Sequence, residues 1–210
     1  MMTRVLDESI LGCAMDNLGS ALDYAVNVLN IGGQDFLDLF VVTGVAEEFG
    51  NGNYIYTTGM SGKKLADEVI RLSGKSCNIP EGEVNGDYSC EYWCGWILAF
   101  YQFHSGLTYK KILSVISYEM LEQSYSVLHE APETKAADVF DGIIRSESFL
   151  ARMRKKRGLT QAELSKKANI SLRSVQLYEQ RINDIGRAQY NNLAAMARVL
   201  SCEIEDLLED

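Results

Sequence analysis

Proline is scarce in this sequence, and no repeat or low-complexity tract interrupts it. The two prolines among 210 residues permit long helices and exclude proline-rich linkers. Hydrophobic residues make up 47% of the chain and charged residues 23%, which is ordinary for a globular protein and unlike a disordered one. The length allows one large domain or two small ones.

The sequence also lacks a hydrophobic run long enough to cross a membrane. Its longest apolar patch, Trp93–Tyr101, is far shorter than the ~20 residues that a membrane helix needs. The first residues, MMTRVLDESILGCAMDN, include acids at positions 7 and 8 and no unbroken apolar core, so we do not expect a secretory signal. The five cysteines are scattered and odd in number, which is typical of free thiols in a reducing compartment. We expect a cytoplasmic protein.

Positive charge is scarce in the first two thirds of the chain. Residues 1–144 contain 8 Lys and Arg against 20 Asp and Glu, a balance of −12, whereas residues 145–210 contain 12 against 9, a balance of +3. Five of those nine acids lie in the final CEIEDLLED, and without them residues 145–202 contain 12 against 4, or +8. A polyanion would therefore repel the first segment and attract the second, although the whole chain carries −9.

Residues 1–130 have the apolar spacing of helices. LGSALDYAVNVLN, QDFLDLFVVTGVAEEF and SGKKLADEVIRLSG repeat apolar residues every three or four positions. Gly44 interrupts the second of these segments, and Ser61 and Gly74 cap the third. Further helices are expected near 107–116 and 118–128. The alternation in residues 54–58 permits a short strand, and CNIPEGEVNGDYSC has the composition of a loop.

One segment, EYWCGWILAFYQFHSG, is apolar nearly all round. A helix of this kind is buried in a core or in an interface, and we favour the core. Residues 131–147 contain Pro132 and the change in charge balance, so they are the expected connection between domains, either as a linker or as a helix. We predict an acidic, mainly helical N-terminal domain at 1–130 and a second domain at 148–208.

Residues 148–208 carry the signals of a small helical bundle. FLARMRKKRG is a basic helix that Gly158 ends. Thr160 and Glu163 form a capping-box pattern at the start of the next helix. Asn169, which tolerates a left-handed conformation, marks a tight turn, and Ser171 caps the helix after it. The residues expected to face inward are Leu150, Met153, Leu164, Ala168, Ile170, Val175, Tyr178, Leu193, Met196, Ala197, Leu200, Ile204, Leu207 and Leu208.

The pattern LTQAELSKKANIS–RSV–YE resembles the Cro/C1-type helix-turn-helix domain, a lambda-repressor-like domain of the XRE family. The resemblance covers residues 148–208, about 30% of the chain. It implies a mainly α protein with a five-helix DNA-binding domain at the C-terminus. Asn169 stands at the usual glycine of the turn. Arg181 stands at the usual glycine after the second helix of the motif, which leaves the path of residues 182–185 open.

The resemblance implies that the second helix of the motif lies in the major groove of double-stranded DNA while the first crosses the backbone. By position, Gln161 contacts a phosphate and braces the residues that contact bases. Arg173 would bind guanine, Gln176 adenine, and Leu172 a thymine methyl. The DNA-binding residues predicted in full are Gln161, Ser171, Leu172, Arg173, Ser174, Gln176, Arg181 and Asn183, with Arg187 and 154–157 as further backbone contacts.

Each of these residues has a structural alternative, and other sites are set aside. Arg173 and Gln176 also fit the solvated face of a helix, and residues 154–157 fit a helix end whose dipole favours cations. Cys90 and Cys94 lack the closer spacing of a structural zinc site, and nothing supplies an oxyanion donor or orienting acid to a Cys–His pair. GNGN and GMSGKK lack the spacing of a phosphate loop. We expect no catalytic site, metal or cofactor.

These observations favour a bacterial-type transcriptional regulator that binds a palindromic operator as a homodimer. An alternative is an antitoxin whose N-terminal domain neutralises a partner toxin and whose helix-turn-helix autoregulates the operon. YWCGWILAFYQFHSG and SYSVLHEA are similar to regions of toxin-associated regulators. A small-molecule sensor, or an enzyme, that uses the N-terminal domain is a third class.

Overall fold

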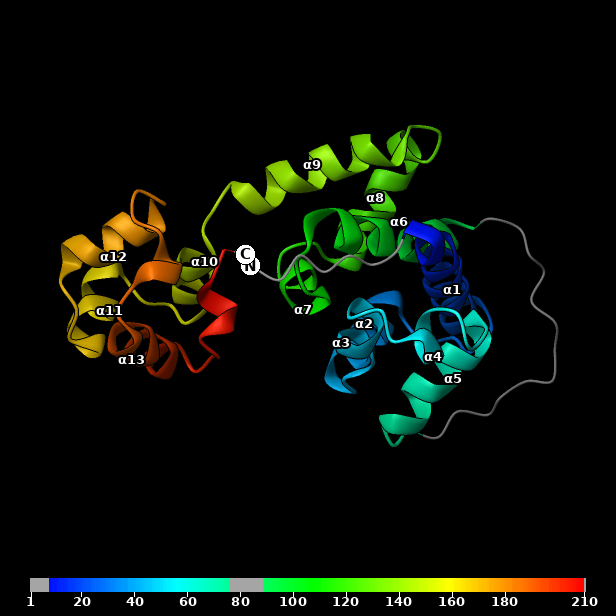
Figure 1. Ribbon diagram of the computed structural model, residues 1–210, viewed down its shortest axis with the longest axis horizontal. Helices are drawn as coiled ribbons and strands as arrows, with labels where there is room; N and C mark the ends of the chain where they lie inside the picture. The colour runs from blue at the N-terminus through cyan, green and yellow to red at the C-terminus, as the bar shows by residue number, and fades with distance from the viewer. Residues whose placement is uncertain (1–7, 76–88, 210) are drawn as a thin grey trace. The chain divides into compact units, whose positions relative to one another are not determined.

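The computed structural model describes residues 8–75 and 89–209, and within them it contains thirteen α-helices, two 3-10 helices and no strand (Figure 1). The predicted mainly α class is confirmed. The chain divides into two compact units, the N-terminal unit (1–141) and the C-terminal unit (142–210). No helix in the described ranges is long and apolar enough to span a membrane. Most of the expected loop CNIPEGEVNGDYSC, and the first seven residues of the N-terminal segment, lie outside those ranges.

The N-terminal unit is built around α1, which packs against α5 and α6. Facing glycines bring α1 and α6 close together. A Cβ on Gly95 would lie 2.4 Å from the Leu18 carbonyl oxygen, and one on Gly19 would lie 2.8 Å from the Tyr92 carbonyl oxygen. The helices are α1 Glu8–Asn27, α2 Gly33–Val42, α3 Val45–Gly50, α4 Tyr54–Thr57, α5 Gly62–Leu72, α6 Cys90–Ser105, α7 Tyr109–Leu113, α8 Tyr118–Leu128 and α9 Glu133–Arg145, the last of which continues into the C-terminal unit.

The apolar helix α6 lies in the core of the N-terminal unit, as its sequence predicts. Trp93, Cys94 and Tyr101 are buried along it. The Tyr101 ring meets Phe140 of α9 edge to face at 5.3 Å, and its hydroxyl donates to Asp141 at 2.9 Å. These contacts fix the first part of α9 within the N-terminal unit. A second aromatic cluster consists of Phe36, Phe40, Phe49 and Tyr109.

The strand permitted by the alternation in residues 54–58 does not form; the segment is the helix α4. The Asn53 side chain caps it by accepting from the Ile55 amide at 3.1 Å. From α1, Asn17 donates to the carbonyl oxygens of Thr57 at 2.7 Å and Met60 at 2.8 Å. The alternation failed as a signal because local capping and these contacts satisfy the backbone without a partner strand.

The C-terminal unit is a bundle around one apolar core. Eleven residues form the core, including Leu150, Leu164 and Val175, and Met153, Tyr178, Ile204 and Leu208 pack against it partly exposed. The last expected helix is a 3-10 helix. The elements after α9 are α10 Phe149–Lys156, α11 Gln161–Ala168, α12 Leu172–Glu179, η1 Ile185–Arg187, α13 Tyr190–Leu200 and η2 Glu205–Leu207 (Figure 1).

Candidate nucleic-acid interface

The first helix of the motif, α11, begins with the capping box that its sequence predicts. The Thr160 hydroxyl accepts from the Glu163 amide at 3.2 Å, and the Glu163 carboxylate accepts from the Thr160 amide at 2.7 Å. The hydrogen bond from the Thr160 amide, followed by one that the Thr160 hydroxyl donates to the same carboxylate oxygen at 2.8 Å, lowers the pKa of Glu163 below its ordinary value. The helix start is thus fixed by two reciprocal hydrogen bonds.

The turn between the two helices is tight and is fixed by α11. Asn169 has φ 54°, in the left-handed region that asparagine tolerates. Ile170 follows it into the core. The Ser165 hydroxyl donates to the Ile170 carbonyl oxygen at 2.6 Å, and the Ser165 carbonyl oxygen accepts from the Ile170 amide at 3.0 Å. These contacts set the angle at which α12 leaves the turn.

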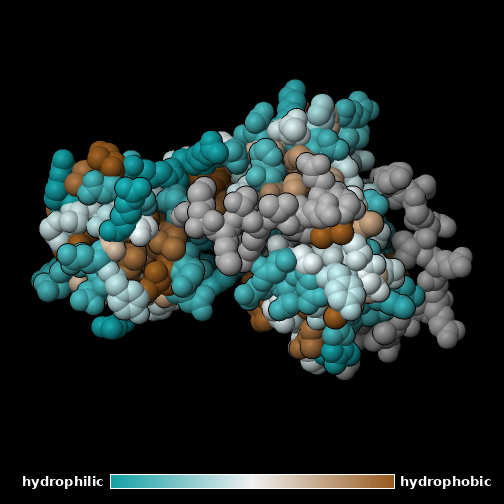
Figure 2. Space-filling view, viewed as in Figure 1, coloured by the Kyte–Doolittle hydropathy of each residue, from teal (hydrophilic) through white to brown (hydrophobic). Residues whose placement is uncertain are grey.

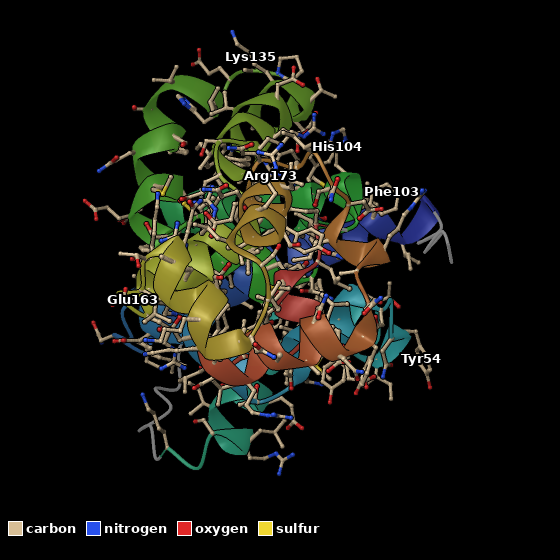
Figure 3. The ribbon with its side chains drawn as sticks, turned by 90° about the vertical axis from the view of Figure 1, so that its left-hand side faces the viewer. Tyr54, Phe103, His104, Lys135, Glu163 and Arg173 are labelled. Carbon is tan, nitrogen blue, oxygen red and sulfur yellow. The ribbon has the colours of Figure 1, made fainter. Side chains whose placement is uncertain are left out.

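The second helix, α12, presents its first turn to solvent. Val175 anchors it in the core, while Leu172 and Arg173 are exposed and Gln176 is half-buried. Figure 3 labels Arg173 on α12 and Glu163 on α11. Ser171 caps the helix by accepting from the Ser174 amide at 3.0 Å, and the two serine hydroxyls lie 2.7 Å apart. The outer surface of this turn therefore offers a cation, an amide, a hydroxyl and an apolar side chain.

A buried network braces α12 from behind. Arg154 of α10 donates to both carboxylate oxygens of Glu179, at 2.6 and 2.9 Å, and to the Leu159 carbonyl oxygen at 2.6 Å. The side chains of Arg154 and Glu179 are 11% and 6% exposed, so this pair is shielded from solvent. Gln161 donates to Glu179 at 2.8 Å. This hydrogen bond uses one of the two N–H bonds of the Gln161 amide group and holds α12.

Most of the basic run at 154–157 is engaged inside the unit. Arg154 binds Glu179, and Lys155 forms an ion pair with Glu147. Arg157 donates to the carbonyl oxygens of Leu200 at 2.5 Å and Ser201 at 3.0 Å, which caps the end of α13. These three side chains are therefore held by groups of the same unit, and the buried Arg154 in particular does not belong to a solvated helix end.

Arg181 stands where the resembling family usually has a glycine after the second helix. Its backbone adopts the left-handed conformation that favours glycine, with φ 55°. This conformation costs an arginine about 1–2 kcal/mol. The next two amides, of Ile182 and Asn183, both donate to the Leu177 carbonyl oxygen, and Ile185 then enters the core. The path that the sequence left open is thus a left-handed exit from α12. Asn183 is exposed, and Arg187 lies 3.3 Å from Asp184.

The geometry matches a known family. Residues 150–207 fit the family model of helix-turn-helix domains. The C-terminal unit is a Cro/C1-type helix-turn-helix domain. The family match supports a DNA-binding regulator. No curated protein and no solved structure matches the chain.

Three side chains of the helix-turn-helix domain were missed by sequence reasoning. Glu179 belongs to the family pattern, but its role in the network does not follow from that pattern. Nothing in the sequence marks Arg152 or Glu209 as a contact residue. Arg152, from α10, donates to the carbonyl oxygens of Ile143 at 2.8 Å and Ile144 at 3.2 Å, in the last turn of α9. No sequence signal reveals these roles, because each joins residues that only the fold brings together.

A few large hydrophobic side chains are exposed on the surface of the helix-turn-helix domain. On the face drawn in Figure 2, hydrophobic side chains form separate patches among hydrophilic ones. Leu172, Ile182 and Tyr190 are the large exposed hydrophobic residues found in the described part of this unit. Leu172 is the first residue of α12, and Ile182 lies shortly after its end.

The two cysteines of α6 differ in burial, Cys90 being partly exposed and Cys94 a core residue. Cys94 is fully buried, and burial raises the pKa of its thiol far above the ordinary value. Burial is also the main cause that raises the pKa of Cys90. Within the described ranges, no three His, Cys, Asp or Glu side chains are grouped to hold a metal ion. Both thiols are therefore protonated at neutral pH, which disfavours thiolate chemistry.

Proposed function

We propose that this protein is a transcriptional regulator that binds a specific operator through α12. The family match supports DNA binding. The observation that carries sequence specificity is the exposed first turn of α12, with Leu172, Arg173 and Gln176 available while Val175 and the Glu179 network hold the helix behind them. A helix whose inner face is held by the core and whose outer face is exposed is suited to the major groove.

The side chains on this turn define the base contacts that we propose. Arg173 binds guanine through its O6 and N7 atoms, Gln176 binds adenine through N6 and N7, and Leu172 touches a thymine methyl. Gln161 donates its remaining N–H to a phosphate, with Ser171 and Ser174 as hydroxyl donors beside it. Asn183, exposed after the helix, contacts the backbone.

A single helix-turn-helix domain of this size contacts only a few base pairs. Useful specificity therefore requires a homodimer on a palindromic operator, with half-sites about one helical turn apart. The N-terminal unit carries 8 Lys and Arg against 20 Asp and Glu, which would keep it away from the duplex. It is the larger unit and the natural place for dimer contacts.

The same acidic balance favours a second candidate function. A unit with 12 more acids than bases suits a basic protein partner, and the protein would then be an antitoxin that also represses its own operon. Affinity purification of the full chain together with the product of the adjacent gene tests this candidate. A stoichiometric complex that survives moderate salt supports it, and separate elution contradicts it.

The regulator proposal is tested by fluorescence anisotropy with DNA from upstream of the protein's own gene. The full chain is titrated across a salt series as wild type and as Arg173→Ala/Gln176→Ala. Arg198→Ala, which removes an exposed arginine of α13, is the matched control. Each bidentate base contact contributes about 1–3 kcal/mol of discrimination, so the double variant should lose at least tenfold in preference for operator over scrambled DNA.

Three results separate the possibilities. Tight wild-type binding whose preference disappears in the double variant and persists in Arg198→Ala supports the proposal. Binding that falls steeply with salt but ignores sequence makes DNA a general partner and contradicts operator recognition. Absence of binding at low salt, where electrostatic attraction is strongest, contradicts the regulator function itself.

A further inference from the structure

Arg181 lies two residues after the end of α12, the proposed recognition helix, and its guanidinium donates hydrogen bonds to groups of the same unit. Nε and Nη2 donate to a single oxygen of Glu209 at 2.9 and 2.8 Å. Nη1 donates to the Arg145 carbonyl oxygen at 2.7 Å, and Nη2 also donates to the Glu147 carbonyl oxygen at 3.0 Å. A guanidinium has five N–H groups, and these contacts use four of them to hold the side chain against the protein.

Glu209 links Arg181 to a second helix. Its other carboxylate oxygen accepts from the Phe149 amide at 3.1 Å, in the first turn of α10. A carboxylate is favoured there because the amides at a helix N-terminus carry partial positive charge. One carboxylate therefore joins the start of α10 to the end of α12.

The backbone of Arg181 carries this link into the recognition helix. Its left-handed conformation returns the chain toward α12, where the Leu177 carbonyl oxygen accepts from the amides of Ile182 and Asn183 at 3.0 and 3.2 Å. Glycine would adopt this conformation without strain. Arginine is more strained than glycine in this conformation, but its side chain forms hydrogen bonds that glycine cannot form.

We infer that Arg181 is a positioning residue for DNA binding: through Glu209 and the carbonyl oxygens at the end of α9 it fixes the end of the recognition helix, and it contacts no phosphate itself. The inference rests on the proposed function, because it assigns a role in operator binding. It replaces the phosphate contact that sequence position alone gives to Arg181.

Glu209→Gln in the full chain is the decisive variant, because it leaves the Arg181 backbone unchanged. Glu205→Gln is the matched control, since it removes the same charge from an exposed position four residues earlier. If only net charge mattered, removing a negative charge from either position would leave the affinity for DNA unchanged or raise it. We expect Glu209→Gln to weaken operator binding by about tenfold, a factor typical of coupled neighbours, and Glu205→Gln not to weaken it.

The salt series separates positioning from phosphate contact. Arg181→Gly should weaken binding with the slope of log K against log salt unchanged, whereas loss of a phosphate contact makes the slope shallower by about 0.9. Arg181→Gly/Glu209→Gln should bind no more weakly than Arg181→Gly alone, because both changes break one pair. A shallower slope, or two additive losses, overturns the inference.

Amide hydrogen exchange of the free protein supplies a readout without DNA. In Glu209→Gln the amides of Phe149 and Ile182 should exchange faster, with Glu205→Gln like wild type, and thermal unfolding should confirm that both variants are folded at the assay temperature. Wild-type binding with equal affinities for Glu209→Gln and Glu205→Gln contradicts the inference alone. Absence of wild-type binding contradicts the proposed function, and the inference fails with it.

Discussion

At the scale of single residues, the pair Arg154–Glu179 is the contact whose loss should be most costly. Both side chains are nearly buried, so removing one leaves a charge without a partner in a poorly solvated site. Glu179→Ala should lower the free energy of unfolding of the C-terminal unit by about 3–5 kcal/mol. Urea unfolding of the full chain, followed by a probe in this unit, measures the loss. Glu205→Ala at an exposed position is the control, and equal midpoints for the two variants would contradict the prediction.

Two left-handed residues of the same domain should respond oppositely to glycine. Asn169 and Arg181 have φ values of 54° and 55°. Asn169→Gly relieves the backbone without removing a described side-chain contact and should leave stability unchanged or raise it by up to about 1 kcal/mol. Arg181→Gly relieves the same strain but loses four hydrogen bonds, so it should lower stability. Thermal unfolding of the two variants decides; shifts of the same sign would contradict this account.

At the scale of elements, the start of α11 should be sensitive to acid. The pKa of Glu163 is lowered in the folded protein, so its ionised form contributes stability that is fully present above the unfolded pKa of about 4.3. That contribution is lost as pH falls through the lower folded value. Glu163→Gln keeps a capping side chain but removes the titration. The stability difference between wild type and Glu163→Gln should be constant above about pH 5 and should shrink below pH 4; a constant difference down to pH 3 would contradict the assignment.

The sequence predicted elements well where the signal was local. The capping residues Ser61, Thr160 and Ser171 begin helices as expected, because a cap acts through its own first turn. Core positions of the C-terminal unit followed the helical spacing for the same reason. The alternation at 54–58 misled because tertiary contacts from α1 determine that segment. The partners of Arg181 lie 28 and 36 residues away, beyond any local pattern.

At the scale of the whole molecule, the end of α9 should belong to the folded DNA-binding unit. Arg152 and Arg181 both donate to carbonyl oxygens of residues 143–147. A fragment of residues 142–210 retains these acceptors, whereas a fragment of 148–210, which starts where the sequence pattern starts, removes them. We expect the first fragment to unfold cooperatively at a Tm several degrees above that of the second, since about 1 kcal/mol shifts the Tm of a domain this small by about 4–8 °C. Equal Tm values would show that the family pattern alone delimits the stable unit.

Five of the 12 basic side chains of the C-terminal unit are held by groups of the same unit. Of its 12 Lys and Arg, Arg152, Arg154, Lys155, Arg157 and Arg181 hold helix ends or carboxylates of the same unit. Sequence-independent affinity for a duplex comes almost entirely from cations that neutralise phosphates. Because five side chains are engaged, the affinity of this unit for random DNA should be lower than its charge balance alone would indicate. If the protein binds an operator as proposed, a lower affinity for random DNA shortens each non-specific encounter, and base contacts then determine most of its residence time at a site.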